Sequence, residues 1–344
     1  MWVYPEKPRP GDRVAVLSLG AALPAVFPGP FELGLARLEE HFELSAVEFP
    51  TTRRLGSTPE ERAADVHAAF ADPEIKAILT SIGGDDQLKV LRHLDADLLR
   101  ANPKPFFGLS DNTNLQLFLW NLGIVSYSGG TVMTLLGRSG AMNPHSVEAL
   151  EAALFTHDWY DLRPADTYTD MNRDWKDPAN LELEPEMLPG TGWQWYGASH
   201  RVEGRLWGGC LEIVDWHLRS GRYLQPNEAY AGSVLFLETS EEMPSDEEVY
   251  RILMCMGERG LLQQFAGLLM GRAKARNFEQ TSLEKAQEYV DAQRAAVLRA
   301  FGEYHPDIPL VFDVDFGHTD PQLAIPTGGE VRIDPAAETI SVRY

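Results

Sequence analysis

The chain has 344 residues, a length typical of two domains, and its 30 Lys and Arg against 51 Asp and Glu give a formal net charge of −21 at pH 7. A chain this acidic is repelled by phosphate backbones and anionic lipid surfaces, which argues against nucleic acid and membranes as partners. Its 44% of hydrophobic and 24% of charged residues exclude wholesale disorder.

Short β-rich runs alternate with helical patterns through the first part of the chain. Thr58, Pro59 and Glu61 form a helix start, because Thr58 can cap, Pro59 suits the first turn and Glu61 completes a capping box. This alternation predicts a parallel sheet covered by helices on both faces. The strands are predicted at 13–19, 45–49, 75–82 and 105–109, and the helices at 31–41, 58–70, 85–99 and 112–122.

The rest of the chain is more mixed. Residues from about 160 to 200 show little periodicity, and a loop this long in a compact protein is either disordered or functional. Trp175, Trp193 and Trp195 argue against disorder. Beyond it we predict strands at 204–209, 233–237, 267–271 and 309–316, helices at 246–259 and 283–301, and a closing hairpin of 331–333 with 339–342.

The sequence predicts a soluble protein. No apolar run approaches the roughly 20 residues that span a bilayer, and residues 1–7 lack the apolar core of a signal peptide. Cys210 and Cys255 are too few for a disulfide framework or a zinc finger. We therefore expect a cytoplasmic protein.

The strongest chemical motif surrounds Ser110. The run Gly108-Leu109-Ser110-Asp111-Asn112 lies between a predicted strand and a predicted helix. A serine on such a sharp turn projects its hydroxyl outward, and the following amide and helix N-terminus favour developing negative charge. This makes Ser110 a candidate nucleophile, and the alternative is a simple helix N-cap.

A second motif, Gly83-Gly84 followed by Asp85 and Asp86, comes after a buried strand. Two glycines let the backbone approach a ligand closely, so their amides are candidates for an oxyanion hole. The alternative is a strand-to-helix turn capped by one of the aspartates. Phosphate binding is disfavoured because two carboxylates flank the site.

A nucleophilic serine needs a base and a group that orients the base. His318 lies in a Gly-flanked loop after a strand, where side chains point into clefts, or else it is an exposed loop histidine. Glu238 ends an apolar strand, where a carboxylate is costly unless it is exposed, paired or functional.

A metal site is a competing interpretation of the same region. Asp313, Asp315, His318 and Asp320 are possible ligands of a divalent ion, with Asp313 and Asp315 on one strand face. Neither an HExxH motif nor a second histidine cluster supports this interpretation, so we expect no bound metal.

The ordered set of motifs resembles the LD-carboxypeptidase family of serine peptidases, which includes the microcin C immunity (MccF-type) proteins. The resemblance spans essentially the whole chain. It is carried by 10–16, 70–78 leading into Gly83-Gly84, 108–111, 204–209, 235–238, 316–318 and 324–329.

By resemblance, Ser110 matches the nucleophile, Glu238 the acid and His318 the base of a Ser–Glu–His triad, with the amides of Gly84 and Asp111 as the oxyanion hole. The family also implies a cytoplasmic homodimer without metal or organic cofactor. Its fold is an N-terminal domain like the class I glutamine amidotransferases, of flavodoxin-like α/β type, and a C-terminal domain of β-barrel-like character. We accordingly divide the chain into 1–165 with the nucleophile, a Trp-bearing linker at 166–200, and 201–344 with Glu238 and His318.

Two segments depart from the family pattern. Cys210 stands where the family usually has Asn after Gly208-Gly209, which puts local substrate contacts in doubt. The first strand ends Leu17-Ser18-Leu19-Gly20 rather than in Ser-Pro-Ser.

The family has two branches with different small-molecule substrates. One removes terminal D-alanine from murein tetrapeptides, and the MccF-type branch cleaves an amide that joins a peptide or amino acid to a modified nucleotide. Aromatic rings stack on bases, so Trp193 and Trp195 are candidate substrate contacts that, with the overall length, favour the MccF-type branch; the alternative is that both tryptophans pack a domain interface. Gly83 and Gly209 are further candidate substrate contacts. An inactive ligand-binding module of the same fold is a further alternative.

Overall fold

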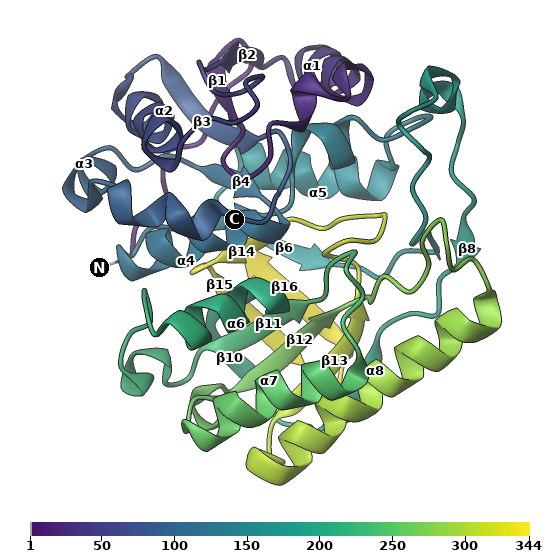
Figure 1. Ribbon diagram of the computed structural model, residues 1–344. Coiled ribbons are helices and arrows are strands. Elements are labelled where there is room, and N and C mark those ends of the chain that lie inside the picture. The colour runs from purple at the N-terminus through teal and green to yellow at the C-terminus, as the bar shows by residue number, and fades with distance from the viewer. Residues whose placement is uncertain (1) are drawn as a thin grey trace.

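The computed structural model describes residues 2–344, which form two large β-sheets with helices packed against them and a third, two-stranded sheet (Figure 1). The first sheet has six strands in the order β14-β5-β4-β3-β1-β2, and its strands are parallel except for β14 against β5. These strands are β1 (Arg13–Leu17), β2 (Ser45–Glu48), β3 (Ile75–Thr80), β4 (Phe106–Gly108), β5 (Ser126–Ser128) and β14 (Ile325–Thr327).

The helices of the first half are α1 (Pro28–Phe42), α2 (Pro59–Ala71), α3 (Ala96–Ala101), α4 (Thr113–Asn121) and α5 (Pro144–Phe155). The Thr58 capping box is present in α2. The helix predicted at 85–99 is wrong: two short 3-10 turns precede α3, which begins only where the Asp95 side chain accepts hydrogen bonds from the amides of Asp97 and Leu98.

The second sheet has eight strands in the order β6-β16-β15-β10-β11-β12-β13-β9, with a parallel centre and antiparallel flanks. The barrel-like character expected of this half takes the form of a mixed sheet with β6 and β9 at its two ends. Its strands are β6 (Trp159–Leu162), β9 (Gln194–Gly197), β10 (Val202–Cys210), β11 (Val234–Glu238), β12 (Gly267–Gly271), β13 (Pro309–Val314), β15 (Glu330–Asp334) and β16 (Thr339–Arg343).

Helices α6 (Leu211–Ser220), α7 (Asp246–Glu258) and α8 (Leu283–Tyr304) lie beside the second sheet in Figure 1. Apolar side chains of β11, β12 and β13, such as Leu235, Leu268 and Leu310, form one buried cluster with residues of these helices. The predicted mixed α/β class with a parallel N-terminal sheet is confirmed.

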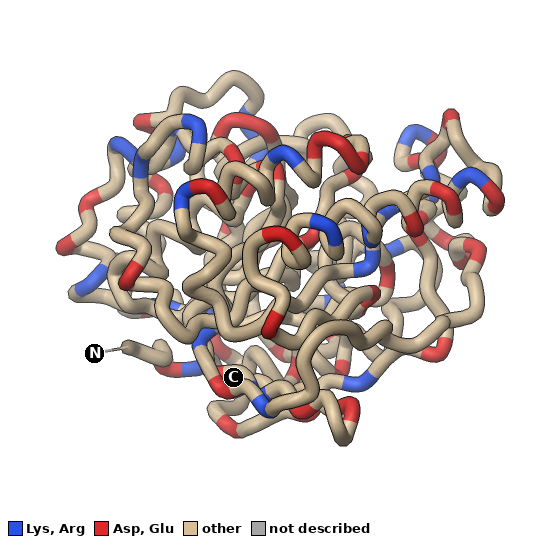
Figure 2. The backbone as a smooth tube through the Cα atoms, turned by 90° about the horizontal axis from the view of Figure 1, so that it is seen from below, with Lys and Arg blue, Asp and Glu red and all other residues tan. Residues whose placement is uncertain are grey.

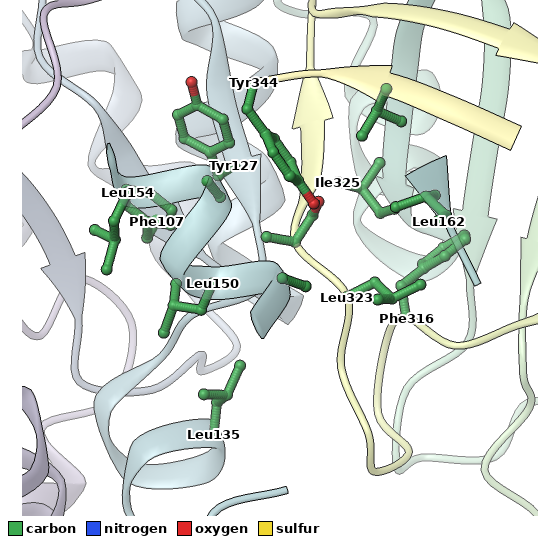
Figure 3. Packing of buried hydrophobic residues seen from close by; sticks show 14 of the residues in the cluster. Phe107, Tyr127, Leu135, Leu150, Leu154, Leu162, Phe316, Leu323, Ile325 and Tyr344 are labelled. Atoms are coloured by element: carbon green, nitrogen blue, oxygen red, sulfur yellow. The ribbon is translucent and has the colours of Figure 1, made fainter. Parts of the chain in front are cut away.

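A shared apolar core joins the two sheets. Figure 3 shows Tyr344, whose ring lies beside Tyr127 of β5 and Ile325 of β14, and these residues belong to one buried cluster with Phe316. The Tyr344 hydroxyl donates to the Ala324 carbonyl at 2.8 Å. Strand β6 lies before residue 165 but belongs to the second sheet, and β14 lies after residue 200 but belongs to the first sheet. The domain limits at 165 and 200 stay a prediction.

The segment 166–200 is not a plain loop. It contains the two-stranded ribbon of β7 (Thr167–Tyr168) with β8 (Leu188–Pro189), a 3-10 turn, and β9, which pairs with β13.

Acidic residues are spread along the chain with basic residues between them (Figure 2). Within residues 2–344, every helix is too short or too polar to cross a membrane.

Candidate active site

Ser110 occupies a strained backbone position directly after β4. Its φ of 63° lies in the left-handed region, which non-glycine residues seldom adopt. The chain turns there from β4 into a 3-10 turn (Ser110–Asn112) that leads into α4. The side chain is half-buried, so the hydroxyl is presented at the surface of a cavity. Strain of this kind clusters at functional sites.

Gly83 lies directly against Ser110. A Cβ atom on Gly83 would lie 2.8 Å from Ser110 Cβ and 3.1 Å from Ser110 Oγ, so any side chain there would collide with the serine. The same Cβ would be 3.4 Å from the Asp111 nitrogen. The Gly83-Gly84 turn and the Ser110 turn, distant in sequence, are thus adjacent, and the predicted role of glycine in allowing close approach has a steric basis.

Glu238 is the last residue of β11 and is fully buried. Two glycines make room for it, because a Cβ atom on either Gly271 or Gly317 would lie 2.8 Å from Glu238 Cβ. His318 Nδ1 donates to Glu238 Oε2 at 2.5 Å. The buried carboxylate therefore has a hydrogen-bonded partner, and it orients the imidazole.

The second nitrogen of His318 faces another carboxylate, Glu241, with 3.0 Å between His318 Nε2 and Glu241 Oε2. Burial lowers the pKa of the His318 imidazole, but Glu238 and then Glu241 more than offset this and raise it to about 10. The hydrogen bond from His318 in turn lowers the pKa of Glu241 to about 2. His318 is thus held as a cation between two carboxylates.

Ser110 and His318 line the same cavity, which has a volume of about 470 Å³. Within residues 2–344, no hydrogen bond joins Ser110 Oγ to His318. The partner of His318 Nε2 is instead the carboxylate of Glu241. Sequence analysis missed Glu241, since nothing in the local pattern marks the third residue after Glu238. Other residues that line the cavity include Gly83, Gly84, Asp85, Trp175, Glu241, Glu242 and Lys274.

The tryptophan at the cavity is Trp175, not Trp193 or Trp195. Trp193 is 8% exposed, belongs to the main core and donates from Nε1 to Asp315 Oδ2 at 2.9 Å. Trp195 pairs with Val311 where β9 joins β13. Neither lines the cavity of Ser110. Trp193 lies in the core and Trp195 packs against it, and the prediction that these two contact substrate stays a prediction.

Gly209 and Cys210 lie at the end of β10, where it contacts α4. A Cβ atom on Gly209 would lie 2.5 Å from Thr113 Oγ1, and the same hydroxyl accepts from the Cys210 amide at 3.1 Å. Cys210 is the register partner of Glu238, and burial raises the pKa of its thiol. Gly209 does not line the cavity and packs β10 on α4, so its predicted substrate contact stays a prediction.

The four residues of the alternative metal site do not converge. Asp313 pairs with Arg294 at 2.7 Å, Asp315 with Arg272 at 3.1 Å, and Asp320 with Arg138 at 2.6 Å. In the part of the chain that the structure describes, no group of three or more His, Cys, Asp or Glu is arranged to hold a metal ion. Each aspartate instead has an arginine partner, which explains why carboxylates are tolerated at these buried positions.

Comparison with known proteins agrees with this architecture. A model described as the LD-carboxypeptidase N-terminal domain matches residues 14–129, and its C-terminal counterpart matches residues 203–333. A putative carboxypeptidase of Treponema pallidum is 30% identical over 292 residues, covering 84% of this chain and 79% of the relative. A probable murein peptide carboxypeptidase of Bacillus subtilis is 27% identical over 342 residues, covering 96% and 91%.

A solved structure has the same fold along nearly the whole chain. The MccF-like protein from Streptococcus pneumoniae, crystallised in complex with AMP, superposes with a TM-score of 0.85 at 25% identity, covering 97% of this chain and 99% of that one.

Proposed function

The chain belongs to the LD-carboxypeptidase family of serine peptidases, and from that premise we propose that it hydrolyses the amide bond of a peptidyl or aminoacyl nucleotide, with Ser110, His318 and Glu238 as its triad. One observation carries the proposal: strained Ser110 and His318 line one cavity, and His318 is hydrogen-bonded to buried Glu238. The nucleotide assignment is supported by Trp175 in the same cavity and by the AMP complex of the Streptococcus pneumoniae protein.

In this mechanism Ser110 Oγ attacks the carbonyl carbon while its proton passes to His318 Nε2. Glu238 accepts the hydrogen bond from His318 Nδ1–H and stabilises the imidazolium that forms. The oxygen of the carbonyl becomes an anion, and the N–H groups of Gly84 and Asp111 stabilise it. The C–N bond then breaks as His318 gives the proton to the leaving nitrogen. Water, deprotonated by His318, releases the acyl group from Ser110 and restores the enzyme.

His318 Nε2 must be free of Glu241 before it can accept the proton of Ser110. Glu241 therefore moves away from Nε2 when substrate enters. Trp175 lines the cavity and offers an indole face, and its ring contacts that of Phe27 with 5.7 Å between ring centroids. Stacking of a base on such a ring is worth about 1–3 kcal/mol.

The second candidate is removal of terminal D-alanine from murein tetrapeptides. The Bacillus subtilis murein peptide carboxypeptidase, which matches 96% of this chain, favours it. Both candidates use the same triad and differ only in what fills the rest of the cavity. The expected homodimer is a separate prediction, which sedimentation analysis checks.

A side-by-side hydrolysis assay tests the proposal. One substrate is an aminoacyl-sulfamoyl adenosine, the other a murein tetrapeptide ending in D-alanine, and Ser110→Ala is the blank for both. The proposal is supported if the wild type cleaves the adenosine compound and not the tetrapeptide, while Ser110→Ala cleaves neither. Cleavage of the tetrapeptide alone moves the assignment to the second candidate, and cleavage of neither overturns both.

A further inference from the structure

Asp111, the residue after the candidate nucleophile, has a fully buried side chain that the proposed chemistry does not use. Its Oδ2 accepts hydrogen bonds from the backbone amides of Asp86 at 3.2 Å and Gln87 at 3.0 Å. Its Oδ1 accepts from Asn114 Nδ2 at 2.8 Å. The carboxylate of one catalytic turn is therefore bonded to the backbone that directly follows the other, Gly83-Gly84.

Backbone encloses this carboxylate. A Cβ atom on Gly20 would lie 2.5 Å from Asp111 Oδ2 and 2.8 Å from the Gly83 carbonyl oxygen, so the unusual end of the first strand packs onto the same junction. No salt bridge pairs Asp111 with a cationic side chain within residues 2–344. The Asp111 carboxylate is thus stabilised by hydrogen bonds from N–H donors. Because hydrogen bonds are directional, the carboxylate in turn fixes the position of these donors.

The network continues away from the cavity into the second half of the chain. Asn114 Oδ1 lies 2.9 Å from His217 Nε2, and His217 is a fully buried residue of α6. Burial lowers the pKa of His217 to about 4, so the ring is neutral at pH 7 and Nε2–H donates to Asn114. With its oxygen occupied in this way, Asn114 must turn its NH₂ group toward Asp111. The arrangement suits an ionised carboxylate.

We propose that the Asp111 carboxylate is a positioning residue, which holds the Gly83-Gly84 turn against the Ser110 turn so that the Gly84 and Asp111 N–H groups converge on the reacting oxygen. The inference rests on the proposed function, because it assigns a role in the oxyanion hole of that mechanism. Removing an oxyanion donor costs about 10²–10³ in rate, and displacement of a catalytic group by about 1 Å can cost 10².

Protonation of Asp111 weakens this arrangement. Burial raises the pKa of Asp111, the hydrogen bonds from the Gln87 and Asp86 amides lower it, and the nearby carboxylates of Asp86 and Asp85 raise it, so that the pKa is about 6. The charged groups that face Asp111 are these two, with Asp86 itself paired to Arg62 at 2.5 Å, and neutral His217 lies behind Asn114. A proton on Oδ1 would point at the Asn114 NH₂ group, so that contact is lost or the amide must turn over.

The test uses Asp111→Asn, which keeps the size of the side chain and removes its charge. The readout is the second-order rate at which a fluorophosphonate labels Ser110, a step that forms an Oγ–P bond, releases fluoride and needs no knowledge of the substrate. We expect labelling at pH 8 to be about 10- to 100-fold slower in the variant. The ratio of wild-type to variant rates should shrink at least severalfold at pH 5, since wild-type Asp111 is then protonated. Titration of His318 cancels in this ratio.

Asp65→Asn is the matched control. Asp65 is likewise a buried carboxylate, and it accepts from the Thr51 amide at 2.7 Å and the Thr51 hydroxyl at 2.6 Å, outside the cavity. We expect it to lower thermal stability without slowing labelling. If Asp111→Asn does not fold, Asn114→Ala is the second variant. It removes the Oδ1 donor together with the bond to His217 and leaves the Asp86 and Gln87 amides in place, and it should slow labelling by about threefold or more.

The outcomes separate the two proposals. Wild-type rates in a folded Asp111→Asn protein at every pH, or in Asn114→Ala where only that variant folds, overturn the positioning role while leaving Ser110 as nucleophile. A wild-type protein that is not labelled at Ser110 overturns the proposed function itself, and the inference with it. Equal slowing by Asp65→Asn and Asp111→Asn also overturns the inference, since loss of any buried carboxylate would then suffice.

Discussion

Glu241 Oε2 lies 3.0 Å from His318 Nε2, the nitrogen that the proposed mechanism needs for the proton of Ser110. A carboxylate in this place stabilises the imidazolium and not the free base. The Glu241 side chain is 63% exposed, so it can move into solvent without breaking core contacts. In this arrangement Glu238 orients the imidazole, and Glu241 covers the nitrogen that the proposed mechanism needs.

Glu241→Gln should move the acid limb of the pH–rate profile to lower pH. Glu241 is one of the two carboxylates that raise the pKa of His318, and loss of its charge lowers that pKa. Above its pKa His318 is a base, so the variant retains activity at pH values where the wild type has lost it. The measurement is kcat/KM from pH 5 to 10. Glu242→Gln, a cavity carboxylate without a bond to His318, is the control, and an identical limb in Glu241→Gln and the wild type would contradict the prediction.

Ser110→Gly should be more stable than Ser110→Ala, although both lack the nucleophile. The φ of 63° at Ser110 suits glycine, and a Cβ in the left-handed region costs roughly 1–2 kcal/mol. Because glycine also gains freedom in the unfolded chain, we expect a net difference of about 1 kcal/mol in the free energy of unfolding. Denaturant titration of the two variants measures it. An alanine variant as stable as the glycine variant would mean that the turn is not strained.

Trp175→Ala should raise KM for an aminoacyl adenylate about tenfold and leave a murein tetrapeptide unaffected, since a lost stack of about 1–3 kcal/mol concerns only the base. Trp193→Ala is the contrasting variant. It leaves a void in the core and removes the bond to Asp315, so it should lower stability by about 3 kcal/mol or more. Steady-state kinetics and thermal unfolding separate the two. Equal changes in KM for both substrates would argue against base stacking by Trp175.

His217→Gln should flatten the loss of stability between pH 6.5 and pH 4. The pKa of His217 is lowered to about 4 in the folded protein, so over this window the unfolded chain binds more protons and stability falls as pH falls. The wild type should lose about 2 kcal/mol from this residue by pH 5. Urea unfolding of both proteins at pH 7 and pH 5 gives the difference. A variant with the wild-type pH dependence would show that His217 is not held neutral.

Local sequence was enough to place much of this site. Alternating strands and helices predicted the parallel sheet, and a serine between β4 and α4 predicted a sharp turn, because both depend on neighbours within a few residues. Resemblance grouped Ser110 with Glu238 and His318, and the latter two are hydrogen-bonded to each other in the structure. Predictions failed where a local pattern was overridden by distant contacts. The helix expected at 85–99 gives way where the amides of Asp86 and Gln87 bond to Asp111.

The tryptophans show why the other contacts of the candidate site could not be predicted from the sequence. Trp175, Trp193 and Trp195 lie in one aperiodic segment, and no local signal separates a ring that packs from one that meets a ligand. In the fold, β9 pairs with β13, and Trp193, just before β9, lies buried and donates to Asp315. Glu241 is similar, since its role depends on where His318, 77 positions along the numbering, is brought by the fold. Most backbone elements, the glycine turns and the types of reactive residue could be predicted from local sequence, because short-range sterics set their preferences. Tertiary structure decided which side chains meet, because those contacts join residues far apart along the chain.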